Sequence, residues 1–180
     1  MHVILSTQFS IQNLTKKLIE QLFHPENMPN LFNTDFLEFL ELLEKHKVEF
    51  LLVGGYAVIL HGYGRSTGDL DLWINQTSDN YYRLKKVYED FGAPIFSKED
   101  FENERLDVWS IGVEPRKIEI LTKVSGLKFV ESSKHCNWLE LEKIKIPYID
   151  FEDLIKNKLA AGRYKDLADI EQLKKLKKED

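Results

Sequence analysis

The feature that most constrains the fold is a pair of aspartates inside an apolar segment, Asp69 and Asp71 in the run DLDLWI. The run alternates polar and apolar residues, which is typical of a half-buried strand. Residues i and i+2 of a strand point to the same face, about 6.6–6.8 Å apart, so the two carboxylates are expected side by side. Leu70 and Leu72 then enter the core. Because adjacent carboxylates repel each other unless a cation compensates them, the pattern predicts a cation-binding strand.

A glycine pair, Gly54 and Gly55, precedes the aspartates and ends the apolar run EFLLV. That run predicts a buried strand, and the following YAVILHG predicts a short helix. Glycines at such a junction leave backbone N–H groups free and let a phosphate approach the chain closely. Mg²⁺ prefers carboxylate and phosphate oxygens as ligands. Either motif alone is commonly a turn or a coincidence, but together they predict a site for a divalent metal and a nucleotide.

The patterns on either side predict a mixed α/β chain. Helices are expected around 11–23, 36–43, 56–62, 78–91, 151–161 and 167–176, and strands at 49–53, 69–74, 106–111, 117–122 and 144–149. Pro147 marks the last strand as an edge strand, because proline cannot donate a ladder hydrogen bond. The order of elements predicts an α+β fold, a small mixed twisted sheet with helices mainly on one face. Residues 1–30 are expected to form an N-terminal helical extension, and 31–180 the domain that carries the predicted site, with C-terminal helices from about residue 151.

Composition narrows the class of protein. The 43% apolar and 31% charged residues are ordinary for a globular domain, and the net charge of −5 argues against a broad basic surface for nucleic acid. The single cysteine excludes an intramolecular disulfide framework and a multi-cysteine zinc site, and it fits a reducing, cytoplasmic setting. No apolar run reaches the roughly 18 residues of a membrane span, and the N-terminus does not have the pattern of a signal peptide.

The pattern Gly-Gly, thirteen residues, Asp-x-Asp resembles the hallmark of the DNA polymerase beta-like nucleotidyltransferase superfamily. The stretch GGYAVILHGYGRSTGDLDLWI is most similar to small stand-alone bacterial nucleotidyltransferases, including abortive-infection, toxin–antitoxin and lincosamide-modifying types. The resemblance implies the polymerase beta-like fold. It also implies that Gly54 and Gly55 cradle the phosphates of a nucleoside triphosphate, and that Asp69 and Asp71 bind Mg²⁺ or Mn²⁺.

The superfamily uses a third carboxylate on a neighbouring strand. Glu119 in KIEILT is flanked by Ile118 and Ile120, so it is expected to project away from the core on the opposite face from both isoleucines. It is the predicted third metal ligand and the candidate general base. The family more often has aspartate here. Asp107 in RLDVWS is the competing candidate, and its alternative role is that of a strand-edge or turn residue.

The C-terminal segment matches a family pattern of Lys, Arg and Asp at Lys158, Arg163 and Asp166. The resemblance implies that the lysine and arginine approach the triphosphate, to which arginine can offer a bidentate fork. The alternative is a solvated, charged helix pair. Arg65 and Thr67 lie in the loop before the aspartates and are further candidates for nucleotide binding. A loop ion pair is the alternative for Arg65.

These residues predict a metal-dependent enzyme that transfers a nucleoside monophosphate to an acceptor hydroxyl and releases pyrophosphate. The acceptor is expected to be RNA, protein or a small molecule, in a toxin–antitoxin or phage-defence setting with a cognate partner and without a membrane. A local basic lip is predicted from Lys156, Lys158, Arg163 and Lys165, so RNA stays among the expected acceptors. Two alternatives remain: a lincosamide- or aminoglycoside-type antibiotic nucleotidyltransferase, and a catalytically silent nucleotide-binding or antitoxin module.

Overall fold

A mixed sheet forms the centre of the computed structural model, which describes residues 31–103, 105–141 and 143–179. Its strands follow the order β3-β4-β2-β1-β6-β5. They are β1 (Phe50–Leu52), β2 (Asp69–Ile74), β3 (Val108–Ile111), β4 (Lys117–Leu121), β5 (Asn137–Glu140) and β6 (Lys145–Tyr148). β2 is parallel to β4 and antiparallel to β1, while β6 is parallel to β1. The expected α+β fold is confirmed, and the predicted extension over 1–30 lies outside the described residues.

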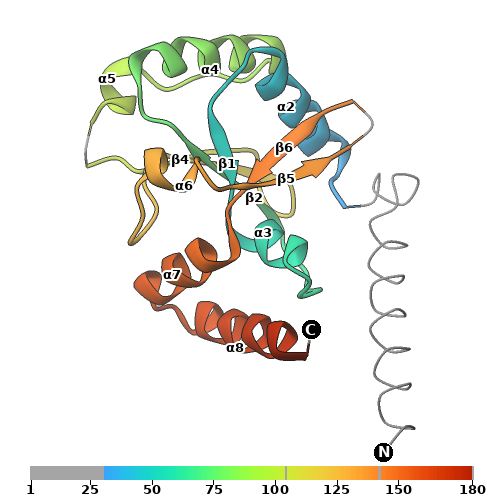
Figure 1. Ribbon diagram of the computed structural model, residues 1–180. Helices are drawn as coiled ribbons and strands as arrows, with labels where there is room; N and C mark the ends of the chain where they lie inside the picture. Colours follow the sequence, from blue (N-terminus) through green and yellow to red (C-terminus); the bar gives the residue numbers. More distant parts are fainter. Residues whose placement is uncertain (1–30, 104, 142, 180) are drawn as a thin grey trace, which may run out of the picture.

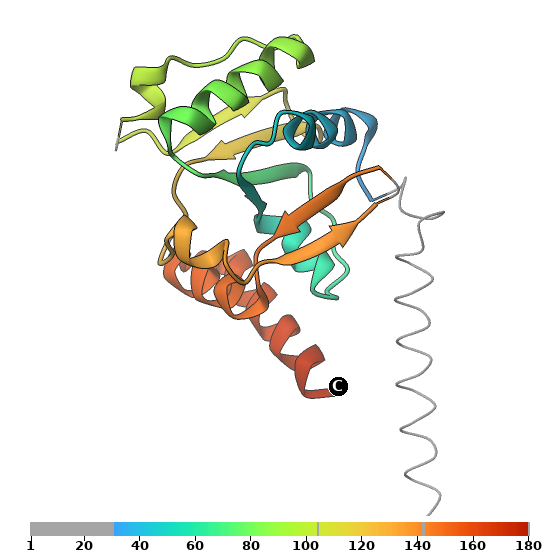
Figure 2. The same cartoon turned by 45° about the horizontal axis from the view of Figure 1, so that its top comes forward.

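The helices are divided between the two faces of the sheet, so the expectation that they lie mainly on one face is wrong (Figure 1). They are α2 (Thr34–Lys45), α3 (Gly54–Leu60), α4 (Ser78–Phe91), α5 (Lys98–Phe101), α6 (Phe129–Ser132), α7 (Phe151–Ala161) and α8 (Tyr164–Glu179). α2 and α4 lie above the sheet in Figure 1, and α7 and α8 lie below it. Figure 2, turned by 45°, shows the same division. The larger core packs under α2 and α4, while the smaller one lies between the sheet and the C-terminal helices.

The alternation of β2 explains why there are two cores. Leu70 and Leu72 are fully buried in the core of α2 and α4. Trp73 points the other way and packs with the C-terminal helices. Its indole Nε1 donates to the carbonyl of Thr122, directly after β4, at 3.2 Å. Asp69 and Asp71 share the face of Trp73 because side chains alternate along a strand. The aspartates therefore point toward the same side of the sheet as α7 and α8.

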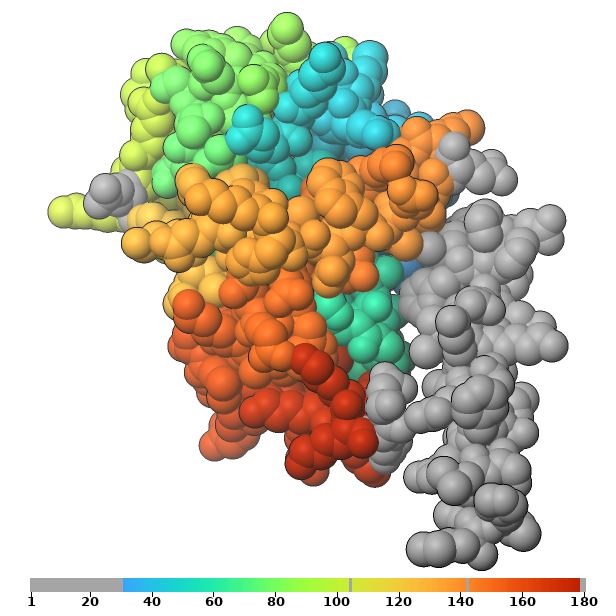
Figure 3. All heavy atoms as spheres, in the orientation of Figure 1, coloured from blue at the N-terminus to red at the C-terminus, as the bar shows by residue number. Residues whose placement is uncertain are grey.

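Capping residues fix the ends of the helices that position the site. The side chain of Asp150 accepts a hydrogen bond from the backbone N–H of Glu152 at 2.9 Å, so α7 begins directly after β6. Gly162 ends α7 in the left-handed conformation, at φ +64°. α8 begins two residues later, so the two helices fold back on each other. Figure 3 shows them in red, below the yellow and orange segments of the sheet.

The prediction that 144–149 forms an edge strand is wrong. β6 lies between β1 and β5, and β5 is the edge strand on that side. Pro147, which lies opposite Trp138 of β5, donates no ladder hydrogen bond, and this is tolerated because β6 pairs with β1 only at Leu52 and Tyr148. β5 itself was not expected from the sequence. None of the described helices combines the length and the hydropathy that a bilayer crossing requires.

Candidate functional site

The pairing of β2 with β4 brings three carboxylates onto one face of the sheet. In this parallel pair Asp71 lies opposite Glu119, and Asp69 lies opposite Lys117. Ile118 on β4 is buried in the opposite core, so Glu119 projects toward the aspartates. The predicted grouping of Asp69, Asp71 and Glu119 is therefore present in the structure.

Asp107, the competing third carboxylate, lies elsewhere. Its carbonyl accepts from the Thr122 backbone N–H at 3.0 Å, just before β3 begins, and its exposed carboxylate pairs with Lys123 Nζ at 3.3 Å. It does not face Asp71, whereas Glu119 does. The geometry therefore favours Glu119 over Asp107 as the partner of the two aspartates.

The glycine pair lies directly against this group. Gly54 has φ +62°, and a Cβ there would overlap the carboxylate of Asp71. A Cβ on Gly55 would overlap Thr67, and the Gly55 N–H donates to Asp71 Oδ2 at 3.4 Å. The backbone also connects the segments, because the Val53 N–H donates to the Asp71 carbonyl at 3.0 Å. Both positions thus need glycine because of close approach, and Gly54 also because of its backbone conformation.

We expect Gly54→Ala to displace the Asp71 carboxylate and to lower stability by at least about 1 kcal/mol, since alanine is strained at positive φ. Metal binding and any transferase activity should fall together. Gly64→Ala is the matched control, because Gly64 lies in the following loop with open space around it. Urea unfolding and Mn²⁺ titration of both variants check this prediction. An unchanged Mn²⁺ affinity in Gly54→Ala would contradict it.

The electrostatics of the carboxylates suit a bound cation. Burial raises the pKa of Asp71 to about 7, and the charge of Glu119 adds to the effect. Asp69 Oδ1 is buried and has no hydrogen-bond partner within the described part of the chain. Buried carboxylates of this kind are stabilised when a metal coordinates them. An all-oxygen donor set fits Mg²⁺ or Mn²⁺ better than zinc or copper.

A lysine ammonium lies among these carboxylates. Lys117 Nζ is 2.8 Å from Glu119 Oε1 and 3.3 Å from Asp69 Oδ2. The hydrogen bond to Glu119 and the neighbouring negative charges raise the pKa of Lys117. Over the described ranges, no three acidic, histidine or cysteine side chains gather closely enough to hold a metal ion by themselves. Lys117 was not predicted from the sequence, although its position two residues before Glu119 on the same strand places it on the same face.

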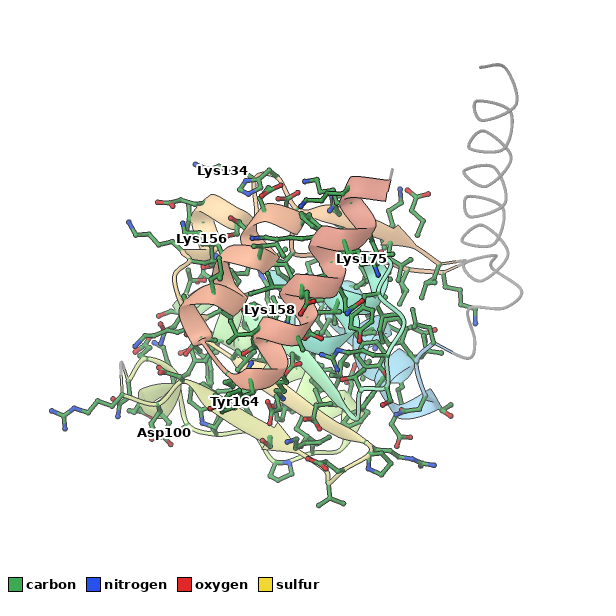
Figure 4. The ribbon with its side chains drawn as sticks, turned by 90° about the horizontal axis from the view of Figure 1, so that it is seen from below. Asp100, Lys134, Lys156, Lys158, Tyr164 and Lys175 are labelled. Carbon is green, nitrogen blue, oxygen red and sulfur yellow. The ribbon has the colours of Figure 1, made fainter. Side chains whose placement is uncertain are left out.

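The C-terminal helices bring a buried ion network to the other side of the site. Lys158 is only 3% exposed, and its Nζ lies 3.0 Å from Asp166 Oδ1 and 2.7 Å from Asp169 Oδ2. Figure 4 shows it between α7 and α8. Arg163 Nε donates to Asp166 Oδ2 at 2.6 Å, and its Nη2 donates to Oδ1 at 3.3 Å. Burial opposes ionisation of Asp166, but hydrogen bonds from Arg163 and Lys158 lower its pKa overall.

The loop before β2 joins the same network. Arg65 Nε lies 2.9 Å from Asp169 Oδ1, and Nη2 donates to Asp169 Oδ2 at 3.2 Å. Arg65 thus forms the loop ion pair that was the alternative to nucleotide binding, and it also lines the cavity. Thr67 lies against Gly55 and also lines the cavity. Asp169 therefore connects the loop, α7 and α8 through two cations.

One cavity of about 420 Å³ collects the predicted site residues. Those that line it are Gly54, Gly55, Arg65, Thr67, Asp69, Asp71, Glu119, Lys158, Arg163 and Asp166. Asn157, Ser125 and Lys123 line it as well and were not singled out from the sequence. These three residues line the cavity because of how α7 packs against the end of β4, and a local sequence pattern does not predict that packing. The cavity thus has an acidic side formed by the sheet and a basic side formed by the C-terminal helices.

Comparisons with known proteins give the family of the chain and a solved structure of the same fold. One similar solved structure is the crystal structure of the lincosamide antibiotic adenylyltransferase LnuA, bound to lincomycin. Its sequence is 19% identical to this chain, the TM-score is 0.53, and the match covers 79% of this chain and 96% of the LnuA chain. A candidate nucleotidyltransferase from Thermotoga maritima is 18% identical, with a TM-score of 0.47, and covers 79% of this chain and 88% of its own. No curated protein matches the chain. The family described as "Nucleotidyltransferase of unknown function (DUF6036)" matches residues 30–179, and the chain belongs to this nucleotidyltransferase family.

Proposed function

We propose that this nucleotidyltransferase is metal-dependent and moves a nucleoside monophosphate from a nucleoside triphosphate to an acceptor hydroxyl. The observation that carries the proposal is one cavity with Asp69, Asp71 and Glu119 on its sheet side and Lys158 and Arg163 on its helical side. Carboxylates suit a divalent metal, and basic side chains suit the phosphates that such a metal accompanies. The cavity therefore has complementary groups for both parts of a metal–nucleotide substrate.

Asp69, Asp71 and Glu119 would hold Mg²⁺ or Mn²⁺, with phosphate oxygens as further ligands. Bound there, a divalent ion would polarise the α-phosphate and make the acceptor hydroxyl easier to deprotonate. The unpartnered oxygen of Asp69 and the raised pKa of Asp71 support this assignment, since coordination would satisfy both carboxylates.

The carboxylate of Glu119 would accept the proton of the acceptor hydroxyl. The hydroxyl oxygen forms a bond to the α-phosphorus, and the bond from that phosphorus to the bridging oxygen of the pyrophosphate breaks. Arg163 would neutralise negative charge on the phosphates, because Asp166 holds its guanidinium in a fixed orientation. Lys158 adds positive charge to the same side. Both oxygens of the fully buried Asp166 are occupied by these cations, so its role in this proposal is to position them.

Gly54 and Gly55 would let the phosphates approach the backbone, since neither has a side chain between β1 and the cavity. Thr67 and Arg65 would border the nucleotide on the loop side. RNA, protein and small hydroxyl-bearing molecules are the acceptor classes in this proposal, with a toxin–antitoxin or phage-defence setting in the cytoplasm. Exposed Arg163 and Lys165 at the cavity support an acceptor with anionic groups.

The test is transfer of label from each of the four α-labelled nucleoside triphosphates, with Mg²⁺, into a cell extract separated into RNA, protein and small molecules. Lincomycin is added separately as a small-molecule probe, because the chain shares its fold with an enzyme that acts on lincosamides. Glu119→Gln and Asp107→Asn are run beside the wild type as a matched pair of carboxylate variants.

Label that requires Mg²⁺ and is lost in Glu119→Gln but kept in Asp107→Asn supports the proposal and names the acceptor class. Loss in Asp107→Asn with retention in Glu119→Gln would reverse the assignment of the third carboxylate. No transfer to any fraction, from a folded protein that also fails to bind nucleotide, would overturn the proposal. Nucleotide binding without transfer would favour the silent nucleotide-binding module.

A further inference from the structure

Lys117 lies between two of the carboxylates to which the proposed function assigns a metal. Its Nζ is 2.8 Å from Glu119 Oε1 and 3.3 Å from Asp69 Oδ2. Both contacts follow from the sheet register, because Lys117 is opposite Asp69 and shares a strand face with Glu119. The lysine side chain is 22% exposed, so its charge is only partly screened by water. The structure thus has a cation of its own among the proposed metal ligands.

We propose that Lys117 is an internal counter-ion that competes with the divalent metal for Asp69 and Glu119 and so sets the metal affinity of the nucleotide-free enzyme. This inference rests on the proposed function, since it takes these carboxylates as the metal ligands. An ammonium and a divalent cation repel each other strongly when they share the same carboxylate oxygens. Metal binding therefore requires the ammonium of Lys117 to move away.

Glu114 offers the displaced ammonium another partner. Its Oε1 lies 3.8 Å from Lys117 Nζ, and its side chain is 74% exposed. A lysine head group can change partner because its four-carbon stem is flexible. An exposed ion pair stabilises little, so the displaced state is less favourable than the one with Asp69 and Glu119. The free enzyme therefore binds metal weakly, and phosphate oxygens of the nucleotide supply the additional ligands that shift the balance.

The experiment measures Mn²⁺ binding to metal-free protein by calorimetry, without nucleotide. Lys117→Met removes the charge but keeps an unbranched apolar chain, and Lys117→Arg keeps the charge. Lys145→Met is the matched control, since Lys145 is an exposed strand lysine paired with Glu140 at 2.6 Å, outside the cavity. We expect Lys117→Met to bind Mn²⁺ at least about tenfold more tightly than wild type, and the other two to stay within about threefold.

Thermal unfolding gives a second readout that does not depend on activity. In chelator, Lys117→Met should unfold at a lower temperature than wild type, because Asp69 and Glu119 are left without their counter-ion. Mn²⁺ should raise its unfolding temperature more than that of wild type, since the tighter ligand stabilises the folded state more. Lys117→Gln is the substitute in both measurements if Lys117→Met does not yield folded protein.

The outcomes separate this inference from the proposed function. If wild type binds Mn²⁺ and Lys117→Met binds it equally or more weakly, the counter-ion role is overturned while the metal site stands. If Lys117→Arg binds as tightly as Lys117→Met, the charge is not what limits the affinity, and the role is again overturned. If no variant binds Mn²⁺, with or without a nucleoside triphosphate, both the metal site and the inference are overturned.

Discussion

Replacing Asp71 with asparagine is expected to abolish nucleotidyl transfer and, at the same time, to stabilise the metal-free protein at pH 8. Activity should fall at least about a thousandfold, because metal coordination contributes several kcal/mol to the transition state and each 1.36 kcal/mol is a factor of ten. Stability should rise because asparagine is neutral and of similar shape. The two effects have opposite signs, which a general disruption of the fold cannot produce.

The stability effect follows from the pKa of Asp71. Burial first, and the charge of Glu119 second, raise that pKa from 3.8 to about 7 in the folded protein. Asp71 therefore contributes fully to the stability of the fold below pH 3.8, and this contribution is lost as the pH rises through about 7. At pH 8 the folded protein holds an ionised carboxylate in an unfavourable place. We expect Asp71→Asn to be more stable there by on the order of 2 kcal/mol, after discounting for water at the cavity mouth.

Urea unfolding at pH 5 and pH 8 in chelator measures this difference, which should be smaller at pH 5. Asp107→Asn is the control, because Asp107 is exposed and pairs only with Lys123 among the contacts described. Saturating Mn²⁺ should remove the advantage of the asparagine variant, since coordination compensates the ionised wild-type side chain. An Asp71→Asn variant less stable than wild type at pH 8 would show that the ionised carboxylate of Asp71 does not destabilise the folded protein.

Much of the site was predictable because its signals are local. The alternation in 69–74 predicted β2 with its observed bounds, and the expected helix over 151–161 is α7. Glu119 was predicted from its flanking isoleucines, and the parallel register places it opposite Asp71. In each case the information lies within a few residues, as it does for strand alternation and helix caps.

The parts that could not be predicted depend on contacts between distant segments. Arg65 and Asp169 are 104 positions apart, so no local pattern reveals their ion pair. The position of β6 inside the sheet depends on pairing with β1 and on β5, whose sequence has no strong strand signal. The short helix α3 begins at Gly54 and not at residue 56, because the glycines themselves enter the first turn against Asp71.

Lys158→Met is expected to be the most destabilising substitution in the C-terminal helices. Lys158 is 3% exposed and compensates two buried carboxylates, Asp166 and Asp169. Breaking a buried ion pair by removing one partner costs about 3–5 kcal/mol. Arg163 and Arg65 still partly compensate the two aspartates, so we expect about 3 kcal/mol. For a domain of this size that corresponds to a fall in Tm of roughly 6–12 °C.

Lys156→Met is the matched control, since Lys156 lies two residues earlier on α7 and is exposed. Its effect should stay within about 0.5 kcal/mol. The difference between wild type and Lys158→Met should depend on pH. The pKa of Asp166 is lowered from 3.8 in the folded protein, so its ion pairs stabilise above that pH and are lost as the pH falls through the folded value. The two proteins should therefore differ most near neutral pH and converge in acid.

Adding Asp169→Asn to Lys158→Met separates a structural role from a role in binding phosphate. If the lysine acts mainly by compensating the buried carboxylates, the double variant recovers part of the lost stability, because one uncompensated charge is removed. Nucleotide affinity should then recover in parallel with folding. If stability recovers but nucleotide affinity does not, the positive charge of Lys158 itself contributes to binding the triphosphate. No recovery of stability would mean that the packing of the lysine stem between α7 and α8, more than its charge, holds the two helices together.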